Sequence, residues 1–253
     1  MLLAIDIGNS LIKFGVFDGE TLVTKFSTAT DRESTADDLN AGVGERLDFP
    51  VTSAIACSVV PPVDDSIKAF VIKAFGIDVR FIDSTFDSGL KVDYHPIASL
   101  GTDRLVNAFA AATKYGKPCI VCSLGTATTI DAVNSNGEFV GGIIAPGMQV
   151  LAKALHLAAA KLPEVEIRKP DSVIGKSTES SIRSGIFYGY IGLVEGLIGR
   201  IAATLPSGAT TVATGGLAAA VASVTGAVEM VDDNLTLEGL NLISRRLYTD
   251  PEK

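Results

Sequence analysis

The opening residues of this chain predict three short strands joined by tight turns, and the same pattern recurs in the second half of the chain. The apolar run Leu2–Ile7 leads into Gly8-Asn9-Ser10, where a glycine and two short polar residues favour a sharp turn. A second strand then runs to an Asp18-Gly19 turn, and a third strand follows. This pattern predicts an antiparallel meander at the start of the chain.

The second copy begins with the apolar run Ile120–Leu124 and the turn Gly125-Thr126-Ala127. An Asn136-Gly137 turn separates the next two strands, as Asp18-Gly19 does in the first copy. Few residues are identical between the copies, so the inference of an internal duplication depends on the order of the elements. We therefore expect an α/β fold of two lobes, residues 1–115 and 116–253, whose mixed sheets flank a nucleotide cleft.

Helical periodicity and buried runs account for the rest of the chain. Ser34 and Asp37 have the spacing of a capping box and predict the start of a helix. Further helices are expected at 64–75, 103–115, 178 to about 204 and 236–247, and further strands at 53–60, 78–82 and 210–213. The final helical segment, about 236–253, can pack back on the first lobe.

The charge balance argues against a nucleic-acid partner. The formal net charge is −8, tryptophan is absent and no Lys/Arg stripe is visible, whereas nucleic-acid binding needs a basic field. Mean hydropathy is +0.36, but no uninterrupted apolar run reaches the roughly 18 residues that a membrane span requires. The first residues lack a basic segment before Asp6, so we expect no signal peptide, no membrane partner and a cytoplasmic location.

The three cysteines, Cys57, Cys119 and Cys122, are expected to be reduced thiols. Cys119 and Cys122 have C-x-x-C spacing, but they lie in an apolar run that reads as one buried strand. Alternation along a strand would point the two thiols to opposite faces, which argues against a shared metal or disulfide. With two histidines in the chain, a histidine-based metal site is not expected either.

Three turns have the composition of nucleotide-binding loops. A glycine with short polar neighbours lets backbone N–H groups approach a phosphate, and Asp6, at the end of the preceding strand, can hold Mg²⁺ that bridges phosphate oxygens. Gly125 and Thr126 open the matching turn, and Gly215, in a diglycine turn after a later strand, can admit adenosine. Taken alone, the first turn is equally compatible with a tight turn and an incidental Asp. No Walker A or G-x-G-x-x-G motif is present.

A fourth motif, Gly101-Thr102-Asp103-Arg104, opens a predicted helix. An Asp near a helix start is commonly a cap that stabilises by roughly 1 kcal/mol. The same position also suits a general base, with Arg104 beside it to bind an anionic group. Spacing alone favours the cap.

Seven short motifs occur in order along the chain: Asp-Ile-Gly-Asn-Ser at 6–10, Gly-Thr-Asp-Arg at 101–104, Gly-Thr-Ala-Thr-Thr at 125–129, Gly-Gly-Ile-Ile-Ala-Pro-Gly at 141–147, Ala-Lys-Leu-Pro at 160–163, Val-Ile-Gly-Lys-Ser-Thr at 173–178 and Thr-Gly-Gly at 214–216. Each is weak alone, but the set resembles the type III pantothenate kinases essentially from end to end. These kinases belong with actin, the acetate and sugar kinases and Hsp70, so the resemblance implies a duplicated ribonuclease H-like (actin-like ATPase) fold.

The resemblance also implies an activity, ATP-dependent phosphorylation of pantothenate to 4'-phosphopantothenate, the first step of coenzyme A biosynthesis. It implies a homodimer, a monovalent cation (K⁺ or NH₄⁺) beside ATP and Mg²⁺, and Asp103 as the base that deprotonates the pantothenate hydroxyl. The expected ATP- and phosphate-binding residues are Asp6, Ile7, Gly8, Asn9, Ser10, Leu11, Ile12, Lys13, Gly125, Thr126 and Gly215. The expected pantothenate contacts are Tyr94, Gly101, Thr102, Asp103, Arg104 and Thr178.

One position departs from the family pattern. Ser123 stands where the family usually has an Asp that ligates the monovalent cation, and a hydroxyl can coordinate a cation but brings no charge. The hypothesis is that cation dependence is weakened or absent, or that ATP binding is poorer. Two alternatives stay open: a non-catalytic, kinase-like regulator or sensor that binds ligand without turnover, and another phosphotransferase of the same fold.

Overall fold

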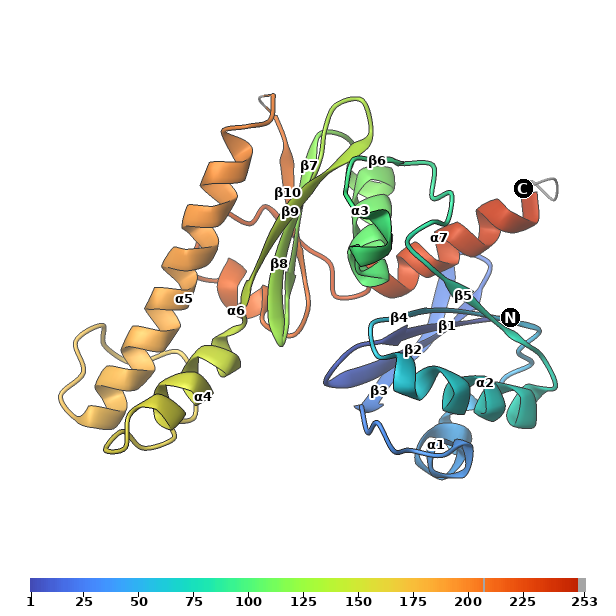
Figure 1. Cartoon of the computed structure of the whole chain (residues 1–253), viewed down its shortest axis with the longest axis horizontal. Helices are drawn as coiled ribbons and strands as arrows, with labels where there is room; N and C mark the ends of the chain where they lie inside the picture. Colours follow the sequence, from blue (N-terminus) through green and yellow to red (C-terminus); the bar gives the residue numbers. More distant parts are fainter. Residues whose placement is uncertain (207, 250–253) are drawn as a thin grey trace. The chain divides into compact units, whose positions relative to one another are not determined.

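The computed structural model describes residues 1–206 and 208–249, which divide into two compact units. Unit 1 comprises Met1–Thr113 together with the chain from Asn234 onward, and unit 2 comprises Lys114–Asp233. Each unit contains a mixed β-sheet with helices against it, as Figure 1 shows. The predicted α/β class is confirmed.

The sheet of unit 1 is built around β1 (Leu2–Ile7), with the strand order β3-β2-β1-β4-β5. The strands β1, β2 (Leu11–Asp18) and β3 (Thr21–Ala29) form the antiparallel meander that the turns predict. On the other side, β4 (Ser53–Ser58) and β5 (Val79–Ile82) run parallel to β1. All six residues of β1 are buried, as expected for a central strand that is covered on both faces.

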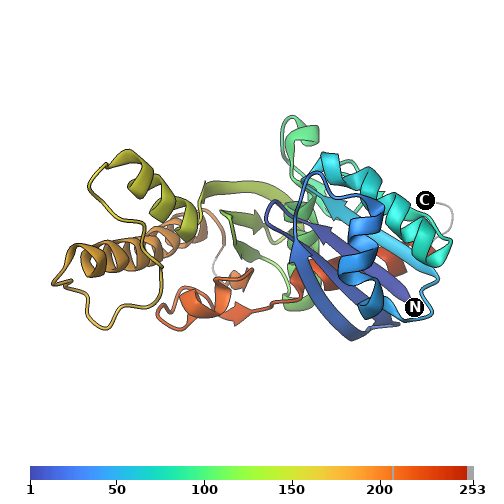
Figure 2. The ribbon, with the colours of Figure 1, turned by 90° about the horizontal axis from the view of Figure 1, so that it is seen from below.

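Helices cover the sheet of unit 1. The core joins apolar side chains of β1, β2 and β4 to those of α1 (Ala36–Val43) and α2 (Pro61–Phe75), the two helices seen in front of the sheet in Figure 2. The last helix, α7 (Leu235–Thr249), packs against β1, β2 and β4 and buries Leu235, Leu237, Leu240 and Ile243. The remaining elements are the 3₁₀ turns η1 (Gly44–Leu47) and η2 (Ile97–Ser99), the short strand β6 (Lys91–Val92) and α3 (Thr102–Tyr115).

Unit 2 repeats the strand arrangement of unit 1. Its strands β7 (Cys119–Leu124), β8 (Ala127–Val133) and β9 (Glu138–Pro146) form a second antiparallel meander. Parallel to β7 run β10 (Thr210–Thr214) and β11 (Met230–Val231), so the order is β11-β10-β7-β8-β9. The predicted duplication of strand order is therefore present in the fold.

Three helices accompany the sheet of unit 2: α4 (Met148–Ala158), α5 (Thr178–Ala202) and the short α6 (Ala218–Ala222). From α5, Phe187, Tyr190 and Val194 enter the core against β7 and β8. By length and composition alone, α5 could cross a membrane, but core helices pass the same test, so this is weak evidence for a span.

Two predicted helix starts were wrong by a few residues. The capping box of α1 is formed by Thr35 and Asp38, one residue beyond the predicted pair Ser34 and Asp37: the Asp38 N–H donates to the Thr35 hydroxyl at 3.3 Å, and the Thr35 N–H donates to the Asp38 carboxylate at 2.9 Å. Helix α2 begins at Pro61, three residues before the predicted start, because proline at the first helical position lacks only an N–H that would have no partner there.

The three cysteines are free and buried. Burial raises the pKa of the Cys119 and Cys122 thiols to about 12, so both stay protonated at neutral pH. Among the described residues, no group of three or more His, Cys, Asp or Glu side chains could hold a metal ion.

Candidate active site

Asp6 lies at the end of β1, between partners on both neighbouring strands. It is opposite Lys13 on β2 and opposite Cys57 on β4, and side chains of register partners project from the same face of a sheet. The Lys13 ammonium is 3.2 Å from Asp6 Oδ2, and the Cys57 thiol donates to Asp6 Oδ1 at 3.8 Å. Asp6 is nearly buried, with 10% of its side chain exposed, so its carboxylate is held in a defined position.

The β1–β2 turn is fixed by Thr30, a residue that the sequence did not single out. The Thr30 hydroxyl donates to the Gly8 carbonyl at 2.7 Å, and the Thr30 N–H donates to the Ser10 carbonyl at 3.0 Å. Across the turn, the Gly8 N–H donates to the Leu11 carbonyl at 3.1 Å. Asn9, Ser10 and Leu11 are exposed, so a ligand can reach the tip of this pinned turn.

Asp103 lies inside the first turn of α3, not at its cap. The helix begins at Thr102, and the Gly101 carbonyl accepts the first helical N–H groups, so the cap reading of Asp103 is wrong. The Arg104 N–H donates to Asp103 Oδ1 at 2.9 Å. A Cβ on Gly101 would stand 2.7 Å from that same oxygen, so any other residue at this position would shift the Asp103 side chain.

The charges around Asp103 connect it with Asp6. Burial raises the pKa of Asp103, the negative charge of Asp6 raises it further, and the hydrogen bond and charge of Arg104 oppose both effects. The structure therefore brings two predicted site carboxylates, one from β1 and one from α3, within electrostatic reach of each other in unit 1.

Arg104 is a buried cation beside an aromatic ring. Its side chain is 4% exposed, Nη1 donates to the Tyr94 hydroxyl at 3.3 Å, and the guanidinium lies over the Tyr94 ring at 5.3 Å from its centre. A cation on an aromatic face gains electrostatic stabilisation, and a planar guanidinium can bind a carboxylate through two N–H groups. Tyr94, Asp103 and Arg104, all predicted pantothenate contacts, are thus neighbours in unit 1.

In unit 2, the two predicted nucleotide-binding turns, at Gly125-Thr126 and at Gly215, lie against each other through their main chains. Gly215 has a φ of +95°, and a Cβ there would stand 2.7 Å from the Leu124 carbonyl oxygen, next to Gly125. The Gly147 N–H donates to the Thr126 carbonyl at 3.0 Å, and a Cβ on Gly147 would lie 2.1 Å from the Gly125 oxygen. Glycine is required at these points because three chain segments touch through their main chains.

Ser123 lies in a row of three hydroxyl side chains. Its register partners are Thr129 on β8 and Thr214 on β10, so the three residues occupy adjacent positions on one face of the sheet. Ser123 is partly exposed, while Thr214 is buried. Hydroxyl oxygens can coordinate a cation, but this row supplies no negative charge.

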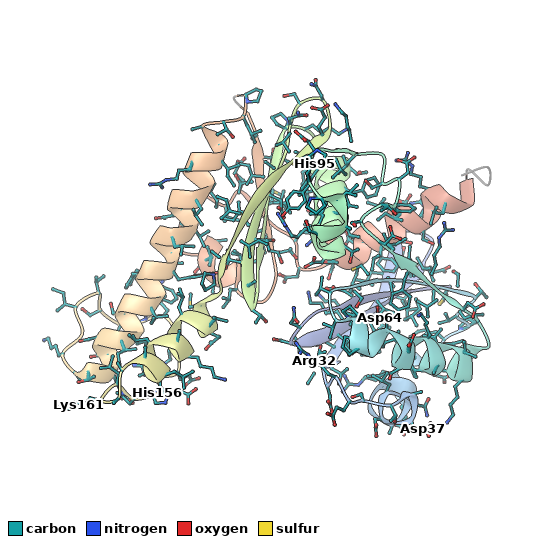
Figure 3. All side chains as sticks on the ribbon, viewed as in Figure 1. Arg32, Asp37, Asp64, His95, His156 and Lys161 are labelled. Carbon is teal, nitrogen blue, oxygen red and sulfur yellow. The ribbon has the colours of Figure 1, made fainter. Side chains whose placement is uncertain are left out.

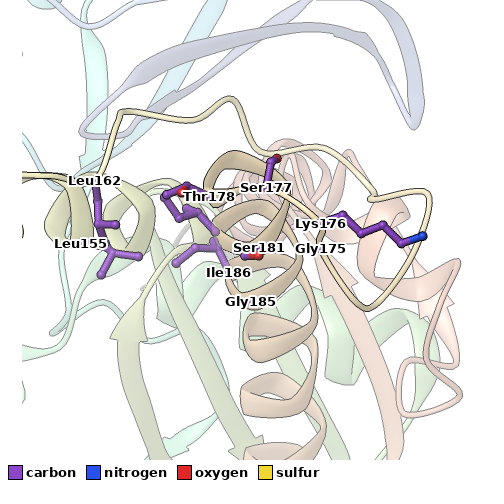
Figure 4. A pocket seen from close by; sticks show the side chains of 10 residues that line it. Leu155, Leu162, Gly175, Lys176, Ser177, Thr178, Ser181, Gly185 and Ile186 are labelled. Carbon is purple, nitrogen blue, oxygen red and sulfur yellow. The ribbon is translucent and has the colours of Figure 1, made fainter.

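Thr178 belongs to a separate pocket at the start of α5. An open cavity of about 700 Å³ is lined by the capping-box residue Ser177, by Lys176, Thr178 and Ser181, and by an apolar wall of Leu155, Leu162, Ile182 and Ile186. Figure 4 labels Leu155, Leu162 and Ile186 of this wall. Its lining does not include Gly125, Thr126, Gly147 or Gly215. A wall of leucine and isoleucine beside hydroxyl groups suits a small organic molecule with both apolar and polar parts.

The sequence did not identify Cys57, Ser58 or Thr30 as site residues. Cys57 faces Asp6 because β4 pairs in parallel with β1, and the Ser58 carbonyl accepts a hydrogen bond from the Thr102 hydroxyl at 3.0 Å. The sequence placed Cys57 and Ser58 near the end of the predicted strand 53–60, where site residues often lie. It did not show that this strand pairs with the strand that carries Asp6.

Comparison with known proteins identifies the family. A sequence model described as type III pantothenate kinase matches residues 2–200. The chain is 39% identical over 252 residues to a protein named type III pantothenate kinase from Geotalea daltonii, covering 97% of this chain and 98% of that one. It is 43% identical to a protein of the same name from Paramagnetospirillum magneticum, covering 98% of each chain.

Solved structures show the fold in more distant proteins. The activator of 2-hydroxyisocaproyl-CoA dehydratase from Clostridium difficile, with bound ADPNP, aligns with a TM-score of 0.57 and 14% identity over 100% of this chain and 97% of that one. A ROK family glucokinase from Streptomyces griseus, in complex with glucose and AMPPNP, aligns with a TM-score of 0.56 and 16% identity over 97% and 99%.

Proposed function

Because this chain belongs to the family of type III pantothenate kinases, we infer that it phosphorylates pantothenate with ATP, the first step of coenzyme A biosynthesis. The observation that carries this inference is the juxtaposition of Asp103 and Arg104 with Asp6 in a chain that matches the family along nearly its whole length. Phosphoryl transfer mainly requires that the reactants are positioned and that the negative charge of the phosphoryl group is neutralised, and this arrangement can supply both.

Asp103 is proposed as the general base. Its carboxylate is buried and tied to the Arg104 N–H, so one oxygen is oriented and the other can accept the proton of the pantothenate hydroxyl. The raised pKa makes the carboxylate a stronger base than an ordinary Asp. Arg104, held over Tyr94, is proposed to bind the carboxylate of pantothenate, and Thr178 is proposed as a further contact.

The phosphate chain of ATP is assigned to the turns. In unit 1, the residues from Asp6 to Lys13 provide backbone N–H groups and an ammonium; in unit 2, Gly125, Thr126 and Gly215 provide closely approachable backbone. Asp6 is proposed to hold Mg²⁺, because carboxylate oxygen is the ligand that this hard cation prefers. When bound, the metal would neutralise charge on the phosphates.

A monovalent cation is proposed near Ser123. The row formed with Thr129 and Thr214 offers neutral oxygen ligands, which fit K⁺ in kind but bind it without help from a negative charge. We therefore expect a weak requirement for K⁺, which an added carboxylate at position 123 would strengthen.

A homodimer formed through unit 2 is part of the proposal. Large apolar side chains on three segments of unit 2 are mostly exposed: Ile144 on β9 is 62% exposed, Leu157 on α4 is 73% exposed, and Ile174 before α5 is 77% exposed. Exposed apolar surface of this kind marks an interaction site, and a second copy of the chain would cover it.

We also propose a cytoplasmic location, because three free thiols suit a reducing compartment.

The test is a coupled ADP-release assay with pantothenate and Mg-ATP, with and without K⁺. We expect pantothenate-dependent turnover, and Asp103→Asn should lower kcat by at least about 100-fold with ATP affinity changed little. Asp65→Asn is the matched control, since Asp65 is an exposed carboxylate near the start of α2 and should leave turnover unchanged.

Ligand binding without turnover in the wild type would overturn the kinase assignment and indicate a regulator. Near-normal turnover of Asp103→Asn would remove Asp103 from the base role. A Ser123→Asp variant with an unchanged K⁺ response would contradict the cation site.

A further inference from the structure

The end of β4 contacts the Asp6 carboxylate and the start of the helix that carries Asp103. Cys57 is opposite Asp6 in the parallel pairing of β4 with β1, and its fully buried thiol donates to Asp6 Oδ1. Ser58, the next residue, accepts a hydrogen bond at its carbonyl from the hydroxyl of Thr102, which immediately precedes Asp103. One dipeptide therefore touches the strand end that carries Asp6 and the helix start that carries Asp103.

The thiol is the rigid partner of Asp6. The Lys13 side chain is 34% exposed and sits on a flexible stem, so its ion pair with Oδ2 can be exchanged for water or for a phosphate. Cys57 is buried in the middle of the sheet and its Sγ can move little. Burial, followed by the charges of Asp6 and Asp103, raises the pKa of Cys57 well above its usual value. The sulfur therefore stays an S–H donor.

The Ser58 side chain fixes the end of β4 in turn. Its hydroxyl accepts the Val60 N–H at 3.1 Å. Val60 immediately precedes α2, the helix that carries Asp64, which is labelled in Figure 3. The strand end is thereby tied to α2, while its carbonyl is tied to α3 through Thr102. The Ser58 carbonyl is therefore a fixed anchor for the first turn of α3.

We propose that Cys57 and Ser58 are positioning residues, which hold Asp6 and Asp103 at the separation that phosphoryl transfer requires. This inference rests on the proposed roles of those two carboxylates. Like charges repel, so without these contacts the two groups would turn away from each other. A misplacement of about 1 Å at a reacting group can cost up to about 100-fold in rate.

The experiment compares variants that differ in one donor. Cys57→Val removes the thiol donor with little change of volume, and Cys57→Ser keeps a donor. Thr102→Val removes the hydroxyl that reaches Ser58, and Thr102→Ser keeps it. Cys119→Val is the control, because Cys119 is an equally buried strand thiol with no carboxylate bound to it in the described structure.

We expect Cys57→Val and Thr102→Val each to lower kcat by about 10-fold or more. Cys57→Val should change KM for pantothenate by less than about 3-fold, because Cys57 is not a predicted pantothenate contact. Cys57→Ser and Thr102→Ser should recover kcat to within about 3-fold of wild type, and Cys119→Val should equal wild type. Thermal unfolding of each variant is measured alongside, and kcat is counted per folded molecule.

Wild-type kcat in Cys57→Val and Thr102→Val, or equal losses in the valine and serine variants, would overturn the proposal while leaving the kinase assignment intact. Absence of turnover in the wild type would concern the proposed function instead. In that case Mg-ADP affinity, measured by calorimetry, decides: Cys57→Val should weaken it by about 5-fold against Cys57→Ser, and equal affinities would refute the role of the thiol.

Discussion

The hydrogen bond between Tyr190 and Thr128 fastens α5 to β8 in the core of unit 2. Their hydroxyl oxygens are 2.6 Å apart, both side chains are completely buried, and neither hydroxyl bonds to any other described residue. Burial also raises the pKa of Tyr190, so the phenol stays neutral at ordinary pH. The bond can thus be tested by removing one hydroxyl at a time.

Tyr190→Phe keeps the ring in place and removes only the oxygen. The Thr128 hydroxyl is then left buried without a partner, which costs about 1–3 kcal/mol. Thr128→Val leaves the Tyr190 hydroxyl in the same situation, at a similar cost. The double variant leaves no unsatisfied hydroxyl, so it should lose much less than the sum of the two single variants. We expect a coupling energy of about 1–2 kcal/mol between the two positions.

The assay is urea unfolding followed by far-UV circular dichroism, with two transitions fitted where the units unfold separately. Thr113→Val, which removes an α3 hydroxyl bonded to its own helix, serves as the control in unit 1. A coupling energy below about 0.3 kcal/mol, or a Tyr190→Phe variant as stable as wild type, would refute the reasoning. It would mean that water or a relaxed neighbour satisfies the remaining hydroxyl.

Three further outcomes are expected. Gly215→Ala should destabilise the chain by about 1–3 kcal/mol in urea unfolding, because of its positive φ and the contact with Leu124; an unchanged midpoint would contradict the strain. Cys119 and Cys122, with pKa values of about 12, should react with a thiol reagent at pH 8 only after unfolding. Because the pKa of Asp103 is raised and the base must be ionised, kcat/KM should fall as pH drops through that raised value, and a pH–rate profile whose acid limb lies at the ordinary Asp value would oppose this.

The elements could be predicted from local pattern because each carries its own signal. The burial of β1 follows from an uninterrupted apolar run, and the turn at Gly137 follows from Asn-Gly. The start of α1 was missed by one residue because Ser34 and Thr35 are both good caps, each followed three residues later by an Asp. Local chemistry fixes the type of an element more firmly than its first residue.

The candidate site was only partly predictable, because it depends on which strands pair. Asp6 and Asp103 could be nominated from motifs, but the contact of Cys57 with Asp6 joins residues about fifty positions apart. Neither hydrophobic period nor turn chemistry reports a parallel pairing of β4 with β1. For the same reason Thr30, which pins the first turn from the far end of β3, gave no signal in the sequence.

The packing of α7 on β1, β2 and β4 has a consequence for synthesis on the ribosome. The strand β1 emerges from the ribosome before unit 2, but α7, which covers it, is made after unit 2. Unit 2 is one continuous segment and has all its strands and helices before α7 exists. The sheet of unit 1 is therefore made before unit 2 but completed after it, and the apolar face that α7 covers is a surface that the nascent chain must shield until α7 emerges.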